Sequence, residues 1–306
     1  MATASVRPRT VRIPVPGGEL TASRLSKAAP TAPTVIALHG ITGNGWAWMP
    51  VAAALEGRLT MWAPDLRGRA GSREVGPPYG MGAHCDDVIA LLDHLKVEKA
   101  VLVGHSMGAW VGALVAARHP ERVSALLFVD GGLGTAMPSW INPDIFMYAV
   151  LGPAISRLTM TFPSASDYLA YWSVHPGLGP SLFGPYGHLI RDYLVRDLVQ
   201  DGDGWRSSCV VDAVRADGSA LLDDHEVLNA PQASVANGIP VTLLWAPRGA
   251  LNQPMGLYGG AWPPWLPLPK GITAERVADT NHYTVIFDPA AVRLVSHRLL
   301  DISGLR

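Results

Sequence analysis

The stretch AVLVGHSMGAWVGALVAA, residues 100–117, decides how this chain folds. It runs for 18 residues without an aspartate, glutamate, lysine or arginine, and such a length would also suit a membrane-spanning helix. Ser106, however, stands between two glycines, and valines cluster ahead of this break. The stretch therefore predicts a buried strand over residues 100–103, a tight turn at Ser106 and a buried helix over residues 107–118.

The turn itself, Gly104-His105-Ser106-Met107-Gly108, fits the pattern G-x-S-x-G. A sharp strand-to-helix turn needs glycine on both sides because a Cβ would clash there, and it exposes the serine hydroxyl at the helix N-terminus. A plain serine in a glycine-rich turn is the alternative interpretation. A serine hydroxyl is a weak nucleophile until a base takes its proton. We therefore expect Ser106 to be a nucleophile and a histidine to follow on a late loop.

His282 is the histidine that fits this role. It lies in the segment ADTNHY, residues 278–283, after the last predicted strand and before the final predicted helix. This position places it over the carboxyl ends of the strands, where α/β sheets hold their sites. For most of the other nine histidines, a surface or core role is the simpler interpretation.

A second glycine turn, His39-Gly40-Ile41-Thr42-Gly43, follows the predicted strand 34–38. We expect the backbone N–H groups of Ile41 and Met107 to bind the negative charge that develops on a substrate carbonyl oxygen. His39 is expected to stabilise the turn rather than to react. The turn Asp65-Leu66-Arg67-Gly68 is expected to shape the neighbouring loop.

Short apolar runs alternate with helical patterns along much of the chain, which favours a mostly parallel α/β sheet. The predicted strands are residues 34–38, 59–63, 100–103, 125–129, 241–245 and 274–278. The predicted helices are residues 86–95, 107–118 and 289–300. Residues 10–15 and 20–25 flank Pro16-Gly17-Gly18 and predict an antiparallel hairpin at the sheet edge.

One long stretch, residues 135–234, interrupts the alternation. It contains helix-like pieces, several prolines and eleven of the 23 aromatic residues, but no obvious core strand. A hundred residues is too long for an ordinary connection. We interpret residues 135–234 as an inserted, mainly helical cap on a core of residues 1–134 and 235–306; an elaborate loop region beside the sheet is the alternative.

The order of these motifs resembles the α/β-hydrolase superfamily along nearly the whole chain, and more narrowly its capped esterase, lactonase and carbon–carbon hydrolase branch. The resemblance implies an α/β-hydrolase fold with the cap after the sixth strand, and neither a metal nor an organic cofactor. Epoxide hydrolases and haloalkane dehalogenases of this superfamily usually carry an aspartate nucleophile, so Ser106 argues against both.

The chain departs from the family at the acid that supports the histidine. The family usually places this acid after the strand that follows the cap, where this chain has Gly249, and residues 246–274 contain no aspartate or glutamate. Some members place it one strand earlier, which corresponds to Asp130. We expect Asp130 to hold His282. A loop-capping role for Asp130, a Ser–His dyad, and a cap acid such as Asp223 or Asp224 stay open.

The many aromatic residues suggest an apolar pocket. Trp46, Trp172 and Arg248 are candidate substrate-binding residues, although Arg248 could equally pair with a nearby carboxylate. The leading hypothesis is a serine esterase that acts on an apolar or aromatic small molecule through an acyl-enzyme. Lactone or carbon–carbon bond hydrolysis by the same pair is the alternative, and a ligand-binding receptor on this scaffold is a more remote one. Perhydrolase or haloperoxidase chemistry could occur as a side reaction.

Composition narrows the partners. The 306 residues carry a net charge of −1 and are 48% hydrophobic, which argues against nucleic-acid binding and long disorder. The two cysteines can build no disulfide framework and show no metal-ligand spacing. No apolar run follows Arg7 and Arg9, so no secretory signal is expected. We expect a cytoplasmic protein with a small-molecule substrate and no stable membrane insertion; a homodimer is left open.

Overall fold

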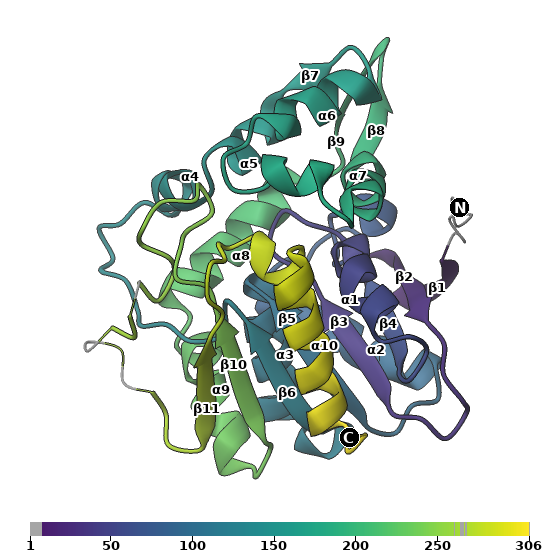
Figure 1. Ribbon diagram of the computed structural model, residues 1–306, viewed down its shortest axis with the longest axis vertical. Coiled ribbons are helices and arrows are strands. Elements are labelled where there is room, and N and C mark those ends of the chain that lie inside the picture. Colours follow the sequence, from purple (N-terminus) through teal and green to yellow (C-terminus); the bar gives the residue numbers. More distant parts are fainter. Residues whose placement is uncertain (1–7, 260, 264–265, 267, 306) are drawn as a thin grey trace.

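A computed structural model describes residues 8–259, 261–263, 266 and 268–305 (Figure 1). Its centre is an eight-stranded sheet in the order β1-β2-β4-β3-β5-β6-β10-β11. The strands are β1 (Arg9–Val15), β2 (Gly18–Ser26), β3 (Thr34–Leu38), β4 (Thr60–Pro64), β5 (Ala100–His105), β6 (Val123–Val129), β10 (Val241–Trp245) and β11 (Ile272–Arg276). β2 runs antiparallel to both of its neighbours, and the remaining pairs are parallel. The predicted mostly parallel sheet with an edge hairpin is thus confirmed.

β11 differs from the sequence expectation by two residues. The prediction followed the apolar residues of 274–278, whereas the strand begins at Ile272, which pairs with Val241 of β10. β11 is an edge strand that pairs only with β10, and its residues are largely half-buried or exposed. An edge strand of this kind gives a weak apolar signal, so hydropathy misplaced its start.

Helices cover both faces of the sheet. The core helices are α1 (Met49–Ala54), α2 (Met81–His94), α3 (Met107–Arg118), α9 (His225–Ala236) and α10 (Pro289–Ile302). α1 and α10 pack together on one face, and α2, α3 and α9 pack together on the other (Figure 1). Short 3-10 helices complete the chain at η1 (Gly45–Trp48), η2 (Ala70–Ser72), η3 (Pro120–Arg122), η4 (Arg157–Thr159), η5 (Gly179–Phe183) and η6 (Thr284–Ile286).

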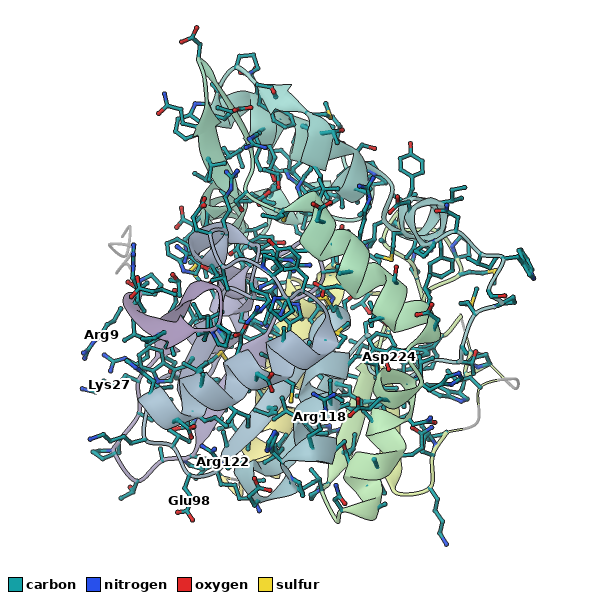
Figure 2. The ribbon with its side chains drawn as sticks, turned by 180° about the vertical axis from the view of Figure 1, so that it is seen from behind. Arg9, Lys27, Glu98, Arg118, Arg122 and Asp224 are labelled. Carbon is teal, nitrogen blue, oxygen red and sulfur yellow. The ribbon has the colours of Figure 1, made fainter. Side chains whose placement is uncertain are left out.

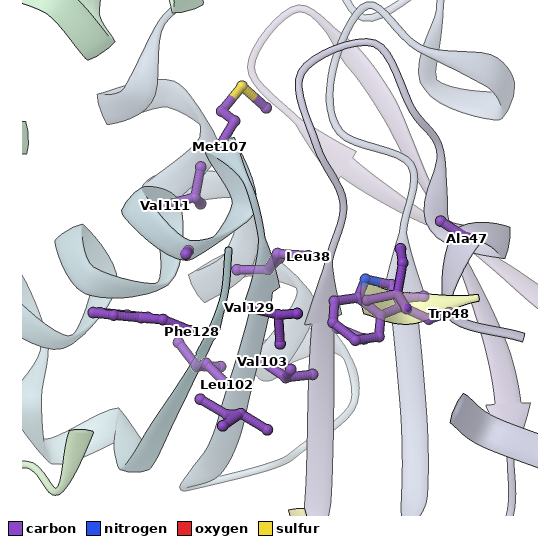
Figure 3. Packing of buried hydrophobic residues seen from close by; sticks show 14 of the residues in the cluster. Leu38, Ala47, Trp48, Leu102, Val103, Met107, Val111, Phe128 and Val129 are labelled. Carbon is purple, nitrogen blue, oxygen red and sulfur yellow. The ribbon is translucent and has the colours of Figure 1, made fainter. Parts of the chain in front are cut away.

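α3 lies deepest in the molecule because it sits between the sheet and two other helices. All of its residues from 107 to 116 are buried, which explains why its sequence is apolar on every side. Figure 3 shows Met107 and Val111 of α3 beside Leu38, Phe128 and Val129 of the sheet, all of them nearly or fully inaccessible. The close packing of this helix on the strands fixes its N-terminus, and Ser106 immediately precedes that end.

α9 is fastened to this core layer. The Arg118 guanidinium at the end of α3 pairs with Glu226 at the start of α9 at 2.6 Å, and the Ser234 hydroxyl donates to the Ala113 carbonyl of α3 at 2.9 Å. Arg118 and Asp224 mark this region in Figure 2. The structure therefore places α9 with the core, whereas the boundary expected after residue 234 falls inside this helix.

Residues between β6 and α9 build the region over the carboxyl ends of the strands (Figure 1). Its helices are α4 (Pro143–Leu151), α5 (Pro153–Ser156), α6 (Ala165–Ser173), α7 (Gly187–Arg196) and α8 (Val211–Asp223). It also contains a three-stranded antiparallel sheet of β7 (Thr161–Phe162), β9 (Gly204–Ser207) and β8 (Leu198–Asp201). Strands of two to four residues are too short for a periodic signal, so the sequence predicted a mainly helical region without this small sheet. We call this region the cap.

The described residues contain neither a helix suited to crossing a membrane nor a cluster of metal-ligating side chains. None of their helices combines the length and the apolar composition that crossing a membrane requires. Within the same part of the chain, no group of three or more histidine, cysteine, aspartate or glutamate side chains could hold a metal ion.

Buried histidines make the stability of this fold depend on pH. Burial lowers the pKa of His39 to about 3 and that of His175 to about 4. The unfolded chain takes up protons below its ordinary histidine pKa of about 6.5, while the folded chain does not. Their contribution is therefore complete above about pH 6.5 and declines as the pH falls towards 4, by up to about 1.4 kcal/mol per pH unit for each histidine.

We predict that His175→Gln reduces the loss of unfolding free energy between pH 7.5 and pH 5.0 by about 1–2 kcal/mol. Urea unfolding at the two pH values measures this difference. His188→Gln, at an exposed position of the cap, is the matched control and should keep the wild-type pH dependence. An equal pH dependence in His175→Gln and wild type would contradict the assignment.

Candidate functional site

The site begins with the turn at Ser106, which lies between β5 and α3. Ser106 has a φ of 53°, in the left-handed region that few non-glycine residues adopt. A Cβ on Gly104 would lie 2.2 Å from the Gly108 carbonyl oxygen, and a Cβ on Gly108 would lie 2.3 Å from the Leu38 carbonyl oxygen. Neither position can carry a side chain, so the G-x-S-x-G pattern is required by the packing of three backbones.

The loop after β6 packs against the same turn. The Ser106 N–H donates to the Val129 carbonyl at 3.0 Å, and a Cβ on Gly131 would lie 2.3 Å from the Ser106 carbonyl oxygen. Asp130 stands between these two contacts and has a φ of 47°. Contact with the serine turn on both sides thus fixes the position of Asp130.

The Asp130 carboxylate holds His282. Its Oδ2 lies 2.6 Å from His282 Nδ1, and its Oδ1 accepts the Ala246 N–H at 3.0 Å. Asp130 is fully buried. Because the carboxylate accepts, we assign the His282 ring proton to Nδ1, which leaves the Nε2 lone pair to take a proton.

The two cap acids considered as alternatives lie elsewhere. Both Asp223 and Asp224 are exposed. The Asp224 carboxylate caps α9 by accepting the N–H groups of Glu226 and Val227 (Figure 2). Of the three candidate acids, the structure brings only Asp130 against His282.

Ser106 and His282 line one cavity of about 30 Å³. Among the described residues, the Ser106 hydroxyl and the His282 ring form no hydrogen bond with each other. Catalytic hydrogen bonds of this kind often tighten only in the complex with substrate, so the looser geometry is compatible with a nucleophile and its base.

His105 holds the histidine loop from the other side. Its Nε2 donates to the His282 carbonyl at 2.7 Å, and the two rings lie 4.7 Å apart. Burial and the neighbouring His282 keep the pKa of His105 well below the ordinary value, so the ring is neutral. His105, which precedes Ser106 in the sequence, therefore positions the backbone of His282.

His39 orients one of the two expected oxyanion donors. Its Nε2 accepts the Leu66 N–H at 2.9 Å, so Nδ1 carries the proton and donates to the Gly40 carbonyl at 2.8 Å. A trans peptide points its C=O and the next N–H in opposite directions. The Ile41 N–H thus faces away from His39, and it donates to no other described residue. Met107, the first residue of α3, offers an N–H that has no partner within its helix.

Two buried arginines donate hydrogen bonds to the next two carbonyl groups of this loop, those of Ile41 and Thr42. Arg69 Nε donates to the Ile41 carbonyl at 3.0 Å, and Arg157 of the cap donates to the Thr42 carbonyl at 2.6 Å. Arg69 also lies 2.6 Å from Asp217 of α8. Burial alone would raise the pKa of Asp217, but His84 and Arg69 lower it to about 2. The loop of Ile41 and Thr42 is therefore held by two arginines, and Arg69 links it through an ion pair to α8 of the cap.

The turn of residues 65–68 has the expected structural contacts. The Asp65 carboxylate accepts the N–H groups of Gly45 and Gly71 at 2.9 and 3.0 Å. The Arg67 guanidinium forms two hydrogen bonds with the buried carboxylate of Asp87, at 2.8 and 2.6 Å. Both contacts fix the loop that adjoins the Ile41 turn.

The three candidate substrate-binding residues do not line the Ser106 cavity. Trp46 donates to the Ser23 hydroxyl at 3.0 Å and lies under the Arg196 guanidinium. Trp172 is 2% exposed and packs against Tyr283 and the Arg157 guanidinium. Large aromatic side chains fill interiors as readily as pockets, and sequence alone does not separate the two.

Arg248, the third of these candidates, holds its own loop together. Its guanidinium donates to the Asn252 side chain at 2.8 Å and to the Asn252 carbonyl. Within the described part of the chain, Arg248 forms no ion pair with a carboxylate, and it does not line the Ser106 cavity.

Sequence reasoning missed Arg157, Arg69 and the positioning role of His105. Arg69 directly follows the Asp65–Gly68 turn, so the sequence placed it in the loop that neighbours Ile41 and could have indicated its contact there. Arg157 lies in the cap 115 residues from the loop that it binds, and no sequence pattern connects the two.

The sheet, the turn at Ser106 and the covering cap together define the α/β-hydrolase fold. A family model described as alpha/beta hydrolase fold matches residues 33–150. A Caulobacter protein named as a carbamate hydrolase, RutD, is 36% identical over 112 residues, which are 36% of this chain and 39% of that protein. The chain thus spans well under half the length of this curated relative.

Solved structures are similar over nearly the whole chain. E-2-(acetamidomethylene)succinate hydrolase matches 97% of this chain and 100% of its own, with a TM-score of 0.70 and 20% identity. A thioesterase domain from the curacin biosynthetic pathway matches 96% of this chain and 99% of its own, with a TM-score of 0.69 and 20% identity. The chain has the α/β-hydrolase fold, and residues 33–150 match the model of that fold family.

We predict that Asp130→Asn lowers kcat by about 10⁴-fold, because an amide donates to His282 Nδ1 and favours the wrong tautomer. Turnover of the p-nitrophenyl ester that wild type cleaves best measures the loss, and circular dichroism checks the fold. Asp224→Asn is the matched control: asparagine also caps helices well, so activity should stay near wild type. Near-normal activity of Asp130→Asn would return the site to a dyad or another acid.

Proposed function

We propose that this protein is a serine hydrolase that cleaves a carboxylic ester of an apolar small molecule through an acyl-enzyme. The observation that carries the proposal is the 2.6 Å contact between His282 Nδ1 and the buried Asp130 carboxylate, beside a serine in a strained turn. Together these supply a nucleophile, a base of defined tautomer and an acid that stabilises the imidazolium.

In the first half-reaction, Ser106 Oγ attacks the ester carbonyl carbon while His282 Nε2 takes the hydroxyl proton. The carbonyl oxygen becomes an oxyanion that the N–H groups of Ile41 and Met107 bind. His282 then gives its proton to the alkoxide oxygen as the C–O bond breaks, which releases the alcohol and leaves Ser106 acylated. In the second half-reaction, His282 activates water, which attacks the acyl carbon, and the acid and free Ser106 are released.

The walls of the Ser106 cavity favour an uncharged group at the reacting centre. Beyond the glycine turn and the two histidines, they consist mainly of apolar and aromatic side chains, those of Ala47, Leu151, Tyr193, Tyr283, Ile286 and Phe287. No lysine, arginine, aspartate or glutamate of the described chain lines this cavity. An ester without a charge beside the scissile bond fits such a surface best.

The same Ser–His pair could cleave other bonds, so the substrate panel must be broad. The names of the similar proteins point to carbamate and enamide-type substrates, and a lactone or a vinylogous diketone tests the alternatives raised by the motifs. Comparing kcat/KM for these compounds with that for p-nitrophenyl butyrate identifies the bond. A preference for a carbamate, lactone or carbon–carbon bond would overturn the ester assignment while keeping the mechanism. Tight ligand binding without acylation would favour a receptor.

We predict that Ser106→Ala abolishes ester turnover, by at least about 10⁴-fold, with the fold intact. Wild type should also take up one equivalent of a fluorophosphonate on Ser106, detected by intact-protein mass spectrometry, whereas Ser106→Ala should take up none. Ser166→Ala, at an exposed cap serine, is the control and should behave like wild type. Persistent turnover or labelling in folded Ser106→Ala would exclude Ser106 as the nucleophile.

A further inference from the structure

The cap forms a second cavity, partly open to solvent, that is much larger than the one at Ser106. Its volume is about 260 Å³, against about 30 Å³ at the serine. It lies between α4, α5, η4 and α8, and α8 contributes Val211, Val214 and Gly218 to its wall. This spacing places the three residues on one face of the helix. α8 therefore turns an apolar face into the cavity.

The walls of the two cavities come close together at the Ile41 side chain. Ile41 lines the serine cavity. A Cβ built on Gly218, a residue of the cap-cavity wall, would lie 3.9 Å from Ile41 Cδ1 and 3.2 Å from Met147 Cγ. α4 contributes to both walls, with Leu151 in the wall of the serine cavity and Met147, one turn earlier, in the wall of the cap cavity. The two walls therefore adjoin at Ile41 and Met147.

The order of the strands indicates which half of an ester would point there. Ser106 follows β5; Ile41 follows β3 on one side, whereas Asp130 and His282 follow β6 and β11 on the other. In the proposed reaction His282 protonates the leaving alcohol, so the alcohol must lie on the His282 side. The acyl chain is then free to extend past Ile41, towards the cap cavity.

The wall chemistry fits an uncharged chain. The only charged residues in the described wall are Asp144 and Arg215, which pair with each other at 3.1 Å with side chains more than half exposed. They form a solvent-facing rim, while Ile155, Leu158 and Val214 line the interior. An apolar cavity of about 150 Å³ holds benzene, so 260 Å³ corresponds to roughly eight to ten carbon atoms.

We propose that the cap cavity is the acyl-chain site of this hydrolase and that it receives a medium-length, unbranched aliphatic acyl group. The proposal rests on the proposed function and specifies its substrate. Met147, which is unbranched and flexible, and Ile41 change rotamer to open the passage, and the chain replaces their contacts. The Ile41 backbone then binds the oxyanion while its side chain borders the acyl chain.

The test compares acyl-chain profiles of cavity-filling variants. The substrates are p-nitrophenyl esters from acetate to decanoate and acetate esters of linear alcohols from ethanol to decanol, assayed with wild type, Val214→Phe and Val195→Phe. Val214 is 5% exposed in the cavity wall, while Val195, on α7, is 39% exposed and lines neither cavity. The same substitution at the two sites controls for the added ring. Gly218→Ala is a milder second variant that crowds the Met147 side chain and keeps the helix.

We expect wild type to prefer esters of about six to ten acyl carbons, in line with the cavity volume. Val214→Phe should lower kcat/KM for p-nitrophenyl octanoate at least tenfold, equivalent to about 1.4 kcal/mol. It should change kcat/KM for p-nitrophenyl acetate less than twofold. Gly218→Ala should lower the ratio of kcat/KM for the octanoate ester to kcat/KM for the acetate ester as well, and Val195→Phe should leave this ratio unchanged. An unchanged octanoate-to-acetate ratio in folded Val214→Phe and Gly218→Ala would overturn the proposal. So would a loss confined to acetate esters of long alcohols, which would place the alcohol in the cavity.

A binding measurement separates failure of this proposal from failure of the proposed function. Calorimetry with octanoate is carried out on Ser106→Ala, with and without Val214→Phe. Suppose that wild type cleaves no ester but that adding Val214→Phe to Ser106→Ala still weakens octanoate binding at least tenfold. The esterase assignment then fails and the acyl-chain site stands. If esters are cleaved and octanoate binding is unaffected by Val214→Phe, the chain site fails and the esterase assignment stands.

Discussion

Close contact between backbones at Ser106 is the constraint on which the rest of this site depends. The turn after β5 contacts the end of β3 at Gly108 and the loop after β6 at Gly131. At both glycines, a Cβ atom would collide with the neighbouring backbone. These contacts fix the serine hydroxyl and also set the distance from it to Ile41 on one side and to Asp130 on the other. Packing of α3 against the sheet keeps the turn in place, because that helix is buried along most of its length.

Neutral, buried histidines then define the directions of the hydrogen bonds around the turn. His39 and His105 have pKa values far below the ordinary one because they are buried, so each carries a single ring proton whose position its partners determine. His39 turns the Ile41 peptide, and His105 holds the loop of His282. Arg157 adds a contact from the cap to the Thr42 carbonyl. The cap is thereby tied mechanically to the expected oxyanion donors as well as covering them.

The position of the acid follows from the order of the strands. β6 lies between β5 and β10, so its carboxyl end is one strand spacing, about 4.8 Å, from each of them. An aspartate after β6 can therefore reach the histidine loop as well as one after β10. The Asp130 carboxylate confirms this reach: one oxygen meets His282, and the other accepts the N–H of Ala246, just after β10. An aspartate after β6 thus contacts the histidine loop in a chain that has Gly249 where the resemblance places the acid.

The sequence by itself determined the sheet, three of the core helices (α2, α3 and α10), the serine turn and the histidine loop, because each depends on a local pattern: apolar runs, helical spacing and glycines beside a serine. It also narrowed the acid to a few aspartates. Only the tertiary structure showed which of them contacts His282. It also showed that Trp46, Trp172 and Arg248 do not line the Ser106 cavity. Likewise, it placed Arg157 against the Thr42 carbonyl and α9 against the core. The cap cavity likewise arises from α4 and α8, which are far apart in sequence. Such features depend on which surfaces meet after the chain has folded, and a local pattern contains no information about that meeting.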